Sequence, residues 1–301
     1  MTEPSKANEK THAARVSVFS NSLLVLLKLA VGVSIGSVAV LSEAVHSATD
    51  LIAALLAFFA VRASDAPPDT RHPYGHGKVE AVAAVLEAVL ILGAGGYIIQ
   101  HSVRALFAST PAQETGWGLV VMGFSALVNT FVARHLHRTA RKTESVALEA
   151  DAHHLWIDVY TSLGVMTGLA LVAVTGRAFF DPLVALVVAV FILKTGWDVM
   201  RAAFAPLVDE RLPDDEISRV EAIIREHPEV LSWHKLRTRK AGSQRHIDVH
   251  IQVEDEMSLR DAHRVTEELE DQMRAAWPGA QVVIHTEPFE EEKRHHEEVP
   301  H

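Results

Sequence analysis

Apolar runs long enough to cross a bilayer recur along the first two thirds of the chain. They cover about 14–35, 37–61, 79–103, 115–137, 147–175 and 180–203, with glycines or charged residues between them. About 20 consecutive apolar residues span a hydrocarbon core as a helix. A soluble core could not bury six such runs, so the pattern predicts six transmembrane helices.

The pattern changes after Pro206 to that of a small soluble α/β domain. Amphipathic helices are predicted at about 214–226 and 258–275, and strands near 231–239, 245–254 and 281–285. This αββαβ order suits a sheet covered on one face by helices. We therefore divide the chain into a polar N-terminal segment (1–13), a transmembrane domain (14–207), a soluble domain (208–289) and a charged tail (290–301).

Basic residues gather before the first span and beside the second and fourth loops. The first loop, around 35–37, has none, and the third and fifth carry mainly Arg104 and Arg177. Because loops rich in Lys and Arg stay inside, both termini are predicted to be cytoplasmic. The inward group comprises Lys6, Lys10, Arg15, Arg62, Arg71, Lys78, Arg134, Arg138, Arg141 and Lys142.

Composition limits the chemistry to nitrogen and oxygen ligands. The 301 residues include 18 histidines and no cysteine, and the formal net charge is −10. Any metal must therefore be held by histidines and carboxylates. The acidic excess after Asp209 argues against a nucleic-acid partner and fits a binder of cations.

Two of the predicted spans repeat one spacing of histidine and aspartate. SEAVHSATD places His46 and Asp50 four residues apart on one helix face, and DAHHLWID does the same for His154 and Asp158. Two imidazole nitrogens and two carboxylates form a tetrahedral set that suits zinc. The alternative is a hydrogen bond between the two helices, but ionisable groups in hydrocarbon are costly and usually functional.

The second predicted loop contains a further candidate site. In DTRHPYGHGK, a proline and two glycines permit a tight turn that could bring Asp69, His72 and His76 together. The alternative is a polar loop whose histidines are simply solvated.

The soluble domain carries histidines on its strands and on its second helix. Each alone is more often an ordinary surface or packed histidine, and spacing cannot separate His246 from His250 on one polar strand face. The tail histidines, His295, His296 and His301, lie in a segment expected to be solvated. The candidate ligands are His234, His250, His263, His285 and Glu287.

Other polar residues interrupt the apolar runs. Glu43 lies one turn from His46 and Asp151 one turn from His154, so both could line an ion path or lie at an interface. The remaining polar residues, which packing or snorkelling explains as well as transport does, are Asn21, Lys28, Glu87 and Asn129.

Together these motifs resemble the cation diffusion facilitator family. The resemblance rests on the paired HxxxD motifs, on HPYGHGKVE at 72–80 and on LRTRKAG and VVIHTEP downstream, and it covers about 12–289. It implies an α-helical membrane protein with six spans and a cytoplasmic, metallochaperone-like metal-binding domain. It also implies a homodimer in the inner membrane that exports a divalent cation in exchange for protons.

Carried over by motif, the resemblance implies three metal sites and a dimer contact. The transport site would be His46, Asp50, His154 and Asp158, the loop site Asp69, His72 and His76, and the domain site His234, His250, His263, His285 and Glu287. Lys78 and Asp209 would form a charge pair at the dimer centre. Glu287 stands where a close zinc-transporting relative has aspartate, which keeps carboxylate chemistry but alters its reach.

We therefore predict a secondary transporter, not an enzyme, that exports Zn²⁺ by alternating access and proton antiport. A histidine must be neutral to bind metal, so protons and metal compete. His46 stands where some iron- or zinc-transporting relatives have aspartate, which favours the zinc- and cadmium-selective branch. Export of Fe²⁺, Mn²⁺, Co²⁺ or Cd²⁺ stays open, as do a membrane metal sensor and a metallohydrolase, although no HExxH motif is present.

Overall fold

The computed structural model describes residues 6–36, 38–108, 116–177 and 179–290. The chain divides into two compact units, Met1–Phe204 and Ala205–His301, each of which is described by itself. The expected tail, with His295, His296 and His301, lies outside the described residues, as does the side chain of Glu43.

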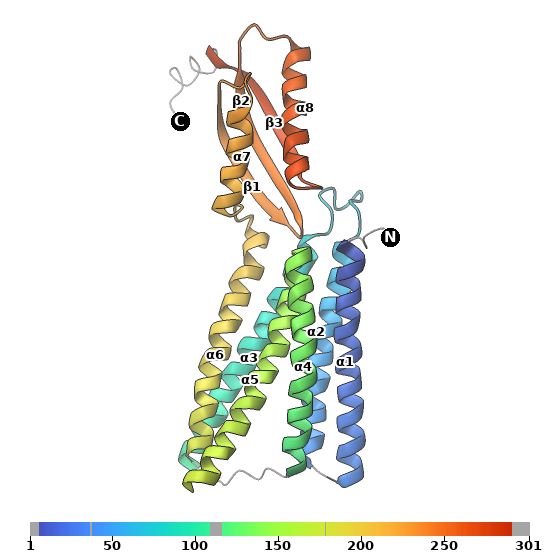
Figure 1. The fold of residues 1–301 in the computed structure, drawn as a ribbon, viewed down its shortest axis with the longest axis vertical. Helices are drawn as coiled ribbons and strands as arrows, with labels where there is room; N and C mark the ends of the chain where they lie inside the picture. The colour runs from blue at the N-terminus through green and yellow to red at the C-terminus, as the bar shows by residue number, and fades with distance from the viewer. Residues whose placement is uncertain (1–5, 37, 109–115, 178, 291–301) are drawn as a thin grey trace. The chain divides into compact units, whose positions relative to one another are not determined.

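The first unit is a bundle of long helices (Figure 1). Six helices are long and apolar enough to cross a membrane, which confirms the predicted membrane fold. The strongest packing joins α1 to α2, α3 to α6 and α4 to α5. The helices are α1 (Lys6–Ile35), α2 (Val38–Ser64), α3 (Lys78–Ala108), α4 (Gly116–Thr143), α5 (Val146–Thr175) and α6 (Phe180–Phe204).

Small residues let these helices approach closely. A Cβ added at Gly196 of α6 would lie 2.7 Å from Ile91 Cγ2 of α3, and one at Gly95 of α3 would lie 2.8 Å from Leu193 Cδ2. Transmembrane helices associate through such close backbone packing, because lipid gives little hydrophobic drive between them.

The first helix starts at Lys6, well before the apolar run near residue 14 where we expected it to start. One face of its first turns is buried: Ala13 and Ala14 are inaccessible and pack in a core with Leu136 and Leu148. Lys10 is only 4% exposed. The polar N-terminal sequence is therefore helical because its partners lie on other helices.

Lys10 belongs to a buried polar network, which we call the Lys10–Glu80 network. Lys10 Nζ lies 2.6 Å from Asp65 Oδ1 and 2.9 Å from Glu80 Oε1. The hydroxyl of Ser64 donates to Glu80 Oε1 at 2.7 Å, and that of Ser145 donates to Glu80 Oε2. These hydrogen bonds and ion pairs connect α1, the end of α2 and the starts of α3 and α5 at one end of the bundle.

The second unit is a three-stranded sheet with both helices on one face. After a short 3₁₀ turn, η1 (Ala205–Val208), come α7 (Asp214–Glu226), β1 (Ser232–Ala241), β2 (Gln244–Val253), α8 (Leu259–Ala276) and β3 (Gln281–Pro288). The strand order is β1-β2-β3, with β1 antiparallel and β3 parallel to β2. This is the predicted αββαβ order (Figure 1).

The alternation of apolar and polar residues along β2 decides which face of the sheet the two helices cover. Ile247, Val249 and Ile251 are buried in one core with residues of α7 and α8, such as Ile224 and Leu269. Because successive strand residues point to opposite faces, His246, Asp248 and His250 lie on the other face. That polar face carries His250, one of the candidate ligands of the domain.

Candidate metal centres

Helices α2 and α5 bring the four residues of the expected transport site together. His46 Nε2 lies 3.7 Å from Asp158 Oδ1, and His154 Nε2 lies 3.3 Å from Asp50 Oδ1. Each imidazole thus faces the carboxylate of the other helix. Two donors bound at about 2.1 Å to one tetrahedral ion lie about 3.4 Å apart, so each contact is compatible with two ligands of one metal ion. Ligand atoms of His46, Asp50 and Asp158 lie within 4.8 Å of one another, and His154 joins this group through its contact with Asp50.

Hydrogen bonding between helices does not account for both contacts. The His46–Asp158 distance of 3.7 Å exceeds the usual limit for a hydrogen bond. Asp50 is buried at 3% exposure, whereas the His46 side chain is 54% exposed. The carboxylate of Asp50 is thus enclosed by the helices, whereas His46 is accessible at the surface of this chain.

Asn129 is a neighbour of this site that the sequence left without a role. Its side-chain amide on α4 donates to Asp158 Oδ2 at 3.4 Å, which leaves Oδ1 to face His46. Supporting hydrogen bonds of this kind orient carboxylate ligands. A second buried polar neighbour is Lys28 of α1, whose Nζ donates to Ser47 Oγ, beside His46, at 2.7 Å.

The loop between α2 and α3 folds around Asp69. Asp69 Oδ1 accepts the backbone N–H groups of Arg71 and His72 at 2.8 and 2.6 Å, and Gly75, at φ 82°, permits the turn that follows. Donation by His72 N–H, and then by Arg71 N–H, lowers the pKa of this carboxyl. His72 Nδ1 lies 3.2 Å and His76 Nε2 3.5 Å from its two oxygens, so the expected three residues do converge.

Glu287 gathers three histidines on the polar face of the sheet. Its carboxylate lies 2.6 Å from His250 Nδ1, 3.1 Å from His234 Nε2 and 3.5 Å from His285 Nε2. Burial raises the pKa of Glu287, but the hydrogen bond from His250 and the charge of the histidines outweigh burial and lower it overall. Two imidazoles and this carboxylate already have ligand atoms within 4.8 Å of one another.

A β-bulge is what places His234 in this group. His234 pairs with His250, and Arg237 pairs with Asp248, so β1 carries one extra residue between these pairs. Lys235, at φ 52°, is the left-handed residue of the bulge. In a regular strand, His234 and Arg237 would point to opposite faces because they are three residues apart. The bulge brings both to the polar face. We did not predict the bulge, although Trp233 and Leu236, which both pack against the apolar core, show the same spacing of three.

His263 is the one expected domain ligand that this group does not include. It lies on α8 with a side chain 70% exposed, and Glu267, one turn on, is 3.4 Å away. Helix α8 packs on the apolar sheet face, whereas the other four residues lie on the polar face. His246 is buried on that polar face opposite Arg239 and Gln281, outside the Glu287 group.

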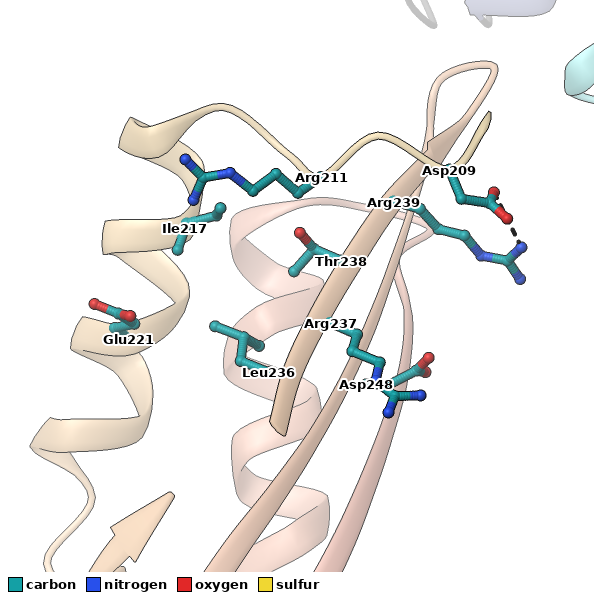
Figure 2. Close-up of a pocket in the computed structure, with 9 residues that line it drawn as sticks. All are labelled: Asp209, Arg211, Ile217, Glu221, Leu236, Arg237, Thr238, Arg239 and Asp248. Carbon is teal, nitrogen blue, oxygen red and sulfur yellow. Dashed lines mark hydrogen bonds and ion pairs between the residues drawn. The ribbon is translucent and has the colours of Figure 1, made fainter. Parts of the chain in front are cut away.

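Asp209 lies in a groove of the second unit that Figure 2 shows. The residue has φ 55°, and its carboxylate accepts Arg239 Nη1 at 3.3 Å. Arg237 and Asp248 face each other on the neighbouring strands along the same groove. Asp209 is thus paired with an arginine within its own unit, and its pairing with Lys78, which begins α3, stays a prediction.

Comparisons with known proteins place these features in one family. Residues 14–208 match the model of the cation efflux transmembrane domain, and residues 212–289 match that of the cytoplasmic domain of cation efflux proteins.

Two bacterial relatives are similar over nearly the whole chain. The transporter sll1263 of a Synechocystis strain is 34% identical over 91% of this chain and 89% of its own. The cation-efflux pump FieF of Citrobacter koseri is 35% identical over 92% of both. Among solved structures, the zinc form of the transporter CzrB is 38% identical, covers 28% of this chain and 96% of its own, and has a TM-score of 0.26.

The two family models together span both units, and both relatives cover about nine tenths of the chain. The six apolar helices and the small αββαβ unit agree with that assignment. The chain belongs to the cation efflux family, and it is a multi-pass membrane transporter of divalent metal cations rather than an enzyme.

Proposed function

We propose that this protein exports Zn²⁺ from the cytoplasm across the inner membrane in exchange for protons, by alternating access. The observation that carries the proposal is the convergence of two imidazoles and two carboxylates from α2 and α5. A four-donor set of nitrogen and oxygen suits zinc, whereas harder cations such as Mn²⁺ prefer oxygen alone.

The crossed pairing of the site supports proton exchange. With a proton on each imidazole, the empty site would hold two cation–carboxylate pairs, His46 with Asp158 and His154 with Asp50. A zinc ion needs the same nitrogens in their neutral form, so its binding expels those protons. Metal and protons then occupy the site in turn, which is the requirement for antiport.

The other two clusters and the dimer contact complete the proposal. The loop residues Asp69, His72 and His76 would bind a second ion near the membrane surface. His234, His250, His285 and Glu287 would bind zinc in the cytoplasmic domain, whereas a role of His263, which lies on α8 apart from this group, stays a prediction. Lys78 and Asp209 would form the charge pair of a homodimer whose termini are cytoplasmic.

The transport proposal is tested with purified protein in sealed vesicles that contain a zinc-sensitive dye. Acid on the metal-loading side should slow export, and acid on the releasing side should accelerate it. The double variant Asp50→Asn/Asp158→Asn should be inactive, while Asp198→Asn, which changes an exposed carboxylate on α6, should retain flux. Equal responses to acid on both sides would favour a uniporter and contradict proton exchange.

The sidedness is tested by labelling. Because the chain contains no cysteine, a single introduced cysteine reports the side on which it lies. Arg71→Cys between α2 and α3 should react with an impermeant reagent from the cytoplasmic side, and Arg177→Cys after α5 from the opposite side. Labelling of both from one side would overturn the proposed orientation.

A further inference from the structure

Two buried carboxylates lie at one level of the bundle, beside the transport site but outside it. Ser145 at the start of α5 binds Glu80 at the start of α3, so both helices enter the bundle at the same height. At a rise of 1.5 Å per residue, Glu87 lies about 10 Å beyond Glu80, and Asp151 about 9 Å beyond Ser145. His154 lies one turn farther along α5.

Neither carboxylate accepts a hydrogen bond of ordinary geometry from a side chain in the described part of the chain. Glu87 is fully buried and Asp151 is 1% exposed. All four of their oxygens are without a hydrogen-bond partner in the part of the chain that the structure describes. The hydroxyl of Ser17 on α1 approaches Asp151 without a hydrogen bond of ordinary geometry.

An apolar cluster lies at the level of the pair. Ala84 and Ala88 on α3 pack with Ala150 on α5 and with Val199 on α6. Ala88 and Ala150 are the sequence neighbours of Glu87 and Asp151. The two carboxylates interact electrostatically with each other, and Asp151 also interacts with the transport-site residues. Two buried, interacting carboxylates without donors are strongly unfavourable unless positive charge joins them.

We propose that Glu87 and Asp151 form a second divalent-cation site, one helical turn from the transport site on the side of the Lys10–Glu80 network. The inference rests on the proposed function in that the cargo is a divalent cation. A dication balances the two negative charges, and the four free oxygens supply its ligands. Because all these donors are oxygens, the site favours harder cations such as Mn²⁺ more than the transport site does.

The test counts Mn²⁺ bound to the full-length protein in detergent, by equilibrium dialysis and mass spectrometry of metal content. Four proteins are compared: the unchanged chain, Glu87→Gln/Asp151→Asn, Asp50→Asn/Asp158→Asn, and the combination of all four changes. The amide substitutions keep side-chain size, and the loop and domain clusters are the same in all four. Ser102→Ala, another buried polar change about 22 Å along α3 from Glu87, is the matched control.

Neutralising Glu87 and Asp151 should remove one Mn²⁺ per chain, both in the unchanged background and in the Asp50→Asn/Asp158→Asn background. Full Mn²⁺ content in the Glu87→Gln/Asp151→Asn protein would overturn the inference and leave the pair as holders of protons. If Asp50→Asn/Asp158→Asn kept its full Mn²⁺ content while Glu87→Gln/Asp151→Asn lost one ion, the assignment of the transport site would be wrong and the inferred second site would stand. Glu87→Gln alone gives the same decision should the paired change prevent folding.

Discussion

Removing the carboxylate of Glu80 should lower the stability of the helix bundle more than removing that of Asp65, although both carboxylates contact Lys10. Glu80 is 1% exposed and accepts from three side chains, Lys10, Ser64 and Ser145. The Asp65 side chain is 25% exposed. Glu80→Ala therefore leaves the Ser145 hydroxyl without its acceptor and weakens the compensation of a buried ammonium, although Ser64 Oγ can still donate to the carbonyl oxygen of Val61. Asp65→Ala, by contrast, leaves Lys10 bound to Glu80.

The expected loss of stability for each substitution follows from how deeply the removed carboxylate is buried. Removing one partner of a buried ion pair costs about 3–5 kcal/mol, and the low end applies here because Asp65 still faces Lys10. Removing a partly exposed partner costs about 1 kcal/mol. One kcal/mol shifts the midpoint of a domain of this size by about 2–4 °C, so Glu80→Ala should lower it by roughly 6–12 °C and Asp65→Ala by about 2–4 °C.

Thermal unfolding of the purified protein in detergent measures both shifts. Lys10→Met/Glu80→Met, which removes both charges and retains volume, should lose less than Glu80→Ala, since replacing a buried pair by apolar groups is often neutral. Equal shifts for Glu80→Ala and Asp65→Ala, or no shift for either, would refute the reasoning that burial sets the value of this network.

Three further predictions concern the metal clusters. His46→Asp should broaden flux toward Mn²⁺ and Fe²⁺ because it replaces nitrogen by oxygen; an unchanged ranking in competition assays would exclude His46 as a selectivity ligand. Lys235→Val, but not Lys235→Gly, should weaken zinc binding to the soluble domain, since a β-branched residue disfavours the left-handed bulge; equal calorimetric affinities would contradict this. The pKa of Glu287 is lowered in the folded domain, so its ionised form stabilises the domain above the usual pKa of 4.5, and this stability is lost as pH falls through the lower pKa of the folded state. Urea unfolding of the metal-free domain should therefore show a loss of stability in acid, and Glu287→Gln should reduce that loss.

The fold was predictable because its signals are local. Hydropathy fixes a span by length alone, and α7 begins and ends at the predicted residues 214 and 226. The HxxxD spacing likewise forces His46 and Asp50, and His154 and Asp158, onto one face of each helix. Convergence of the two helices was inferred from the repetition of the motif.

The features that the sequence did not show depend on contacts distant along the chain. The helical start at Lys6 is stabilised by Glu80 and Asp65, and Asn129 reaches Asp158 from a third helix. The bulge at Lys235 adds one residue to β1, and its position becomes clear only from the pairing of β1 with β2. In each case the partner is identifiable only once the helices or strands are in place.

One arrangement recurs in all three clusters and has a consequence for transport. Histidines lie against a carboxylate around Asp69, around Glu287 and in the crossed pairs of the transport site. In each cluster a protonated imidazole next to the carboxylate would compete with a metal ion, so acid should weaken metal binding at every one of them. A fall in flux with acid on the loading side is therefore a sum of three effects. It can be assigned to the transport site only if it survives in a protein that carries His72→Ala and His250→Ala, because these changes remove one histidine ligand from the loop cluster and one from the domain cluster and leave all four residues of the transport site unchanged.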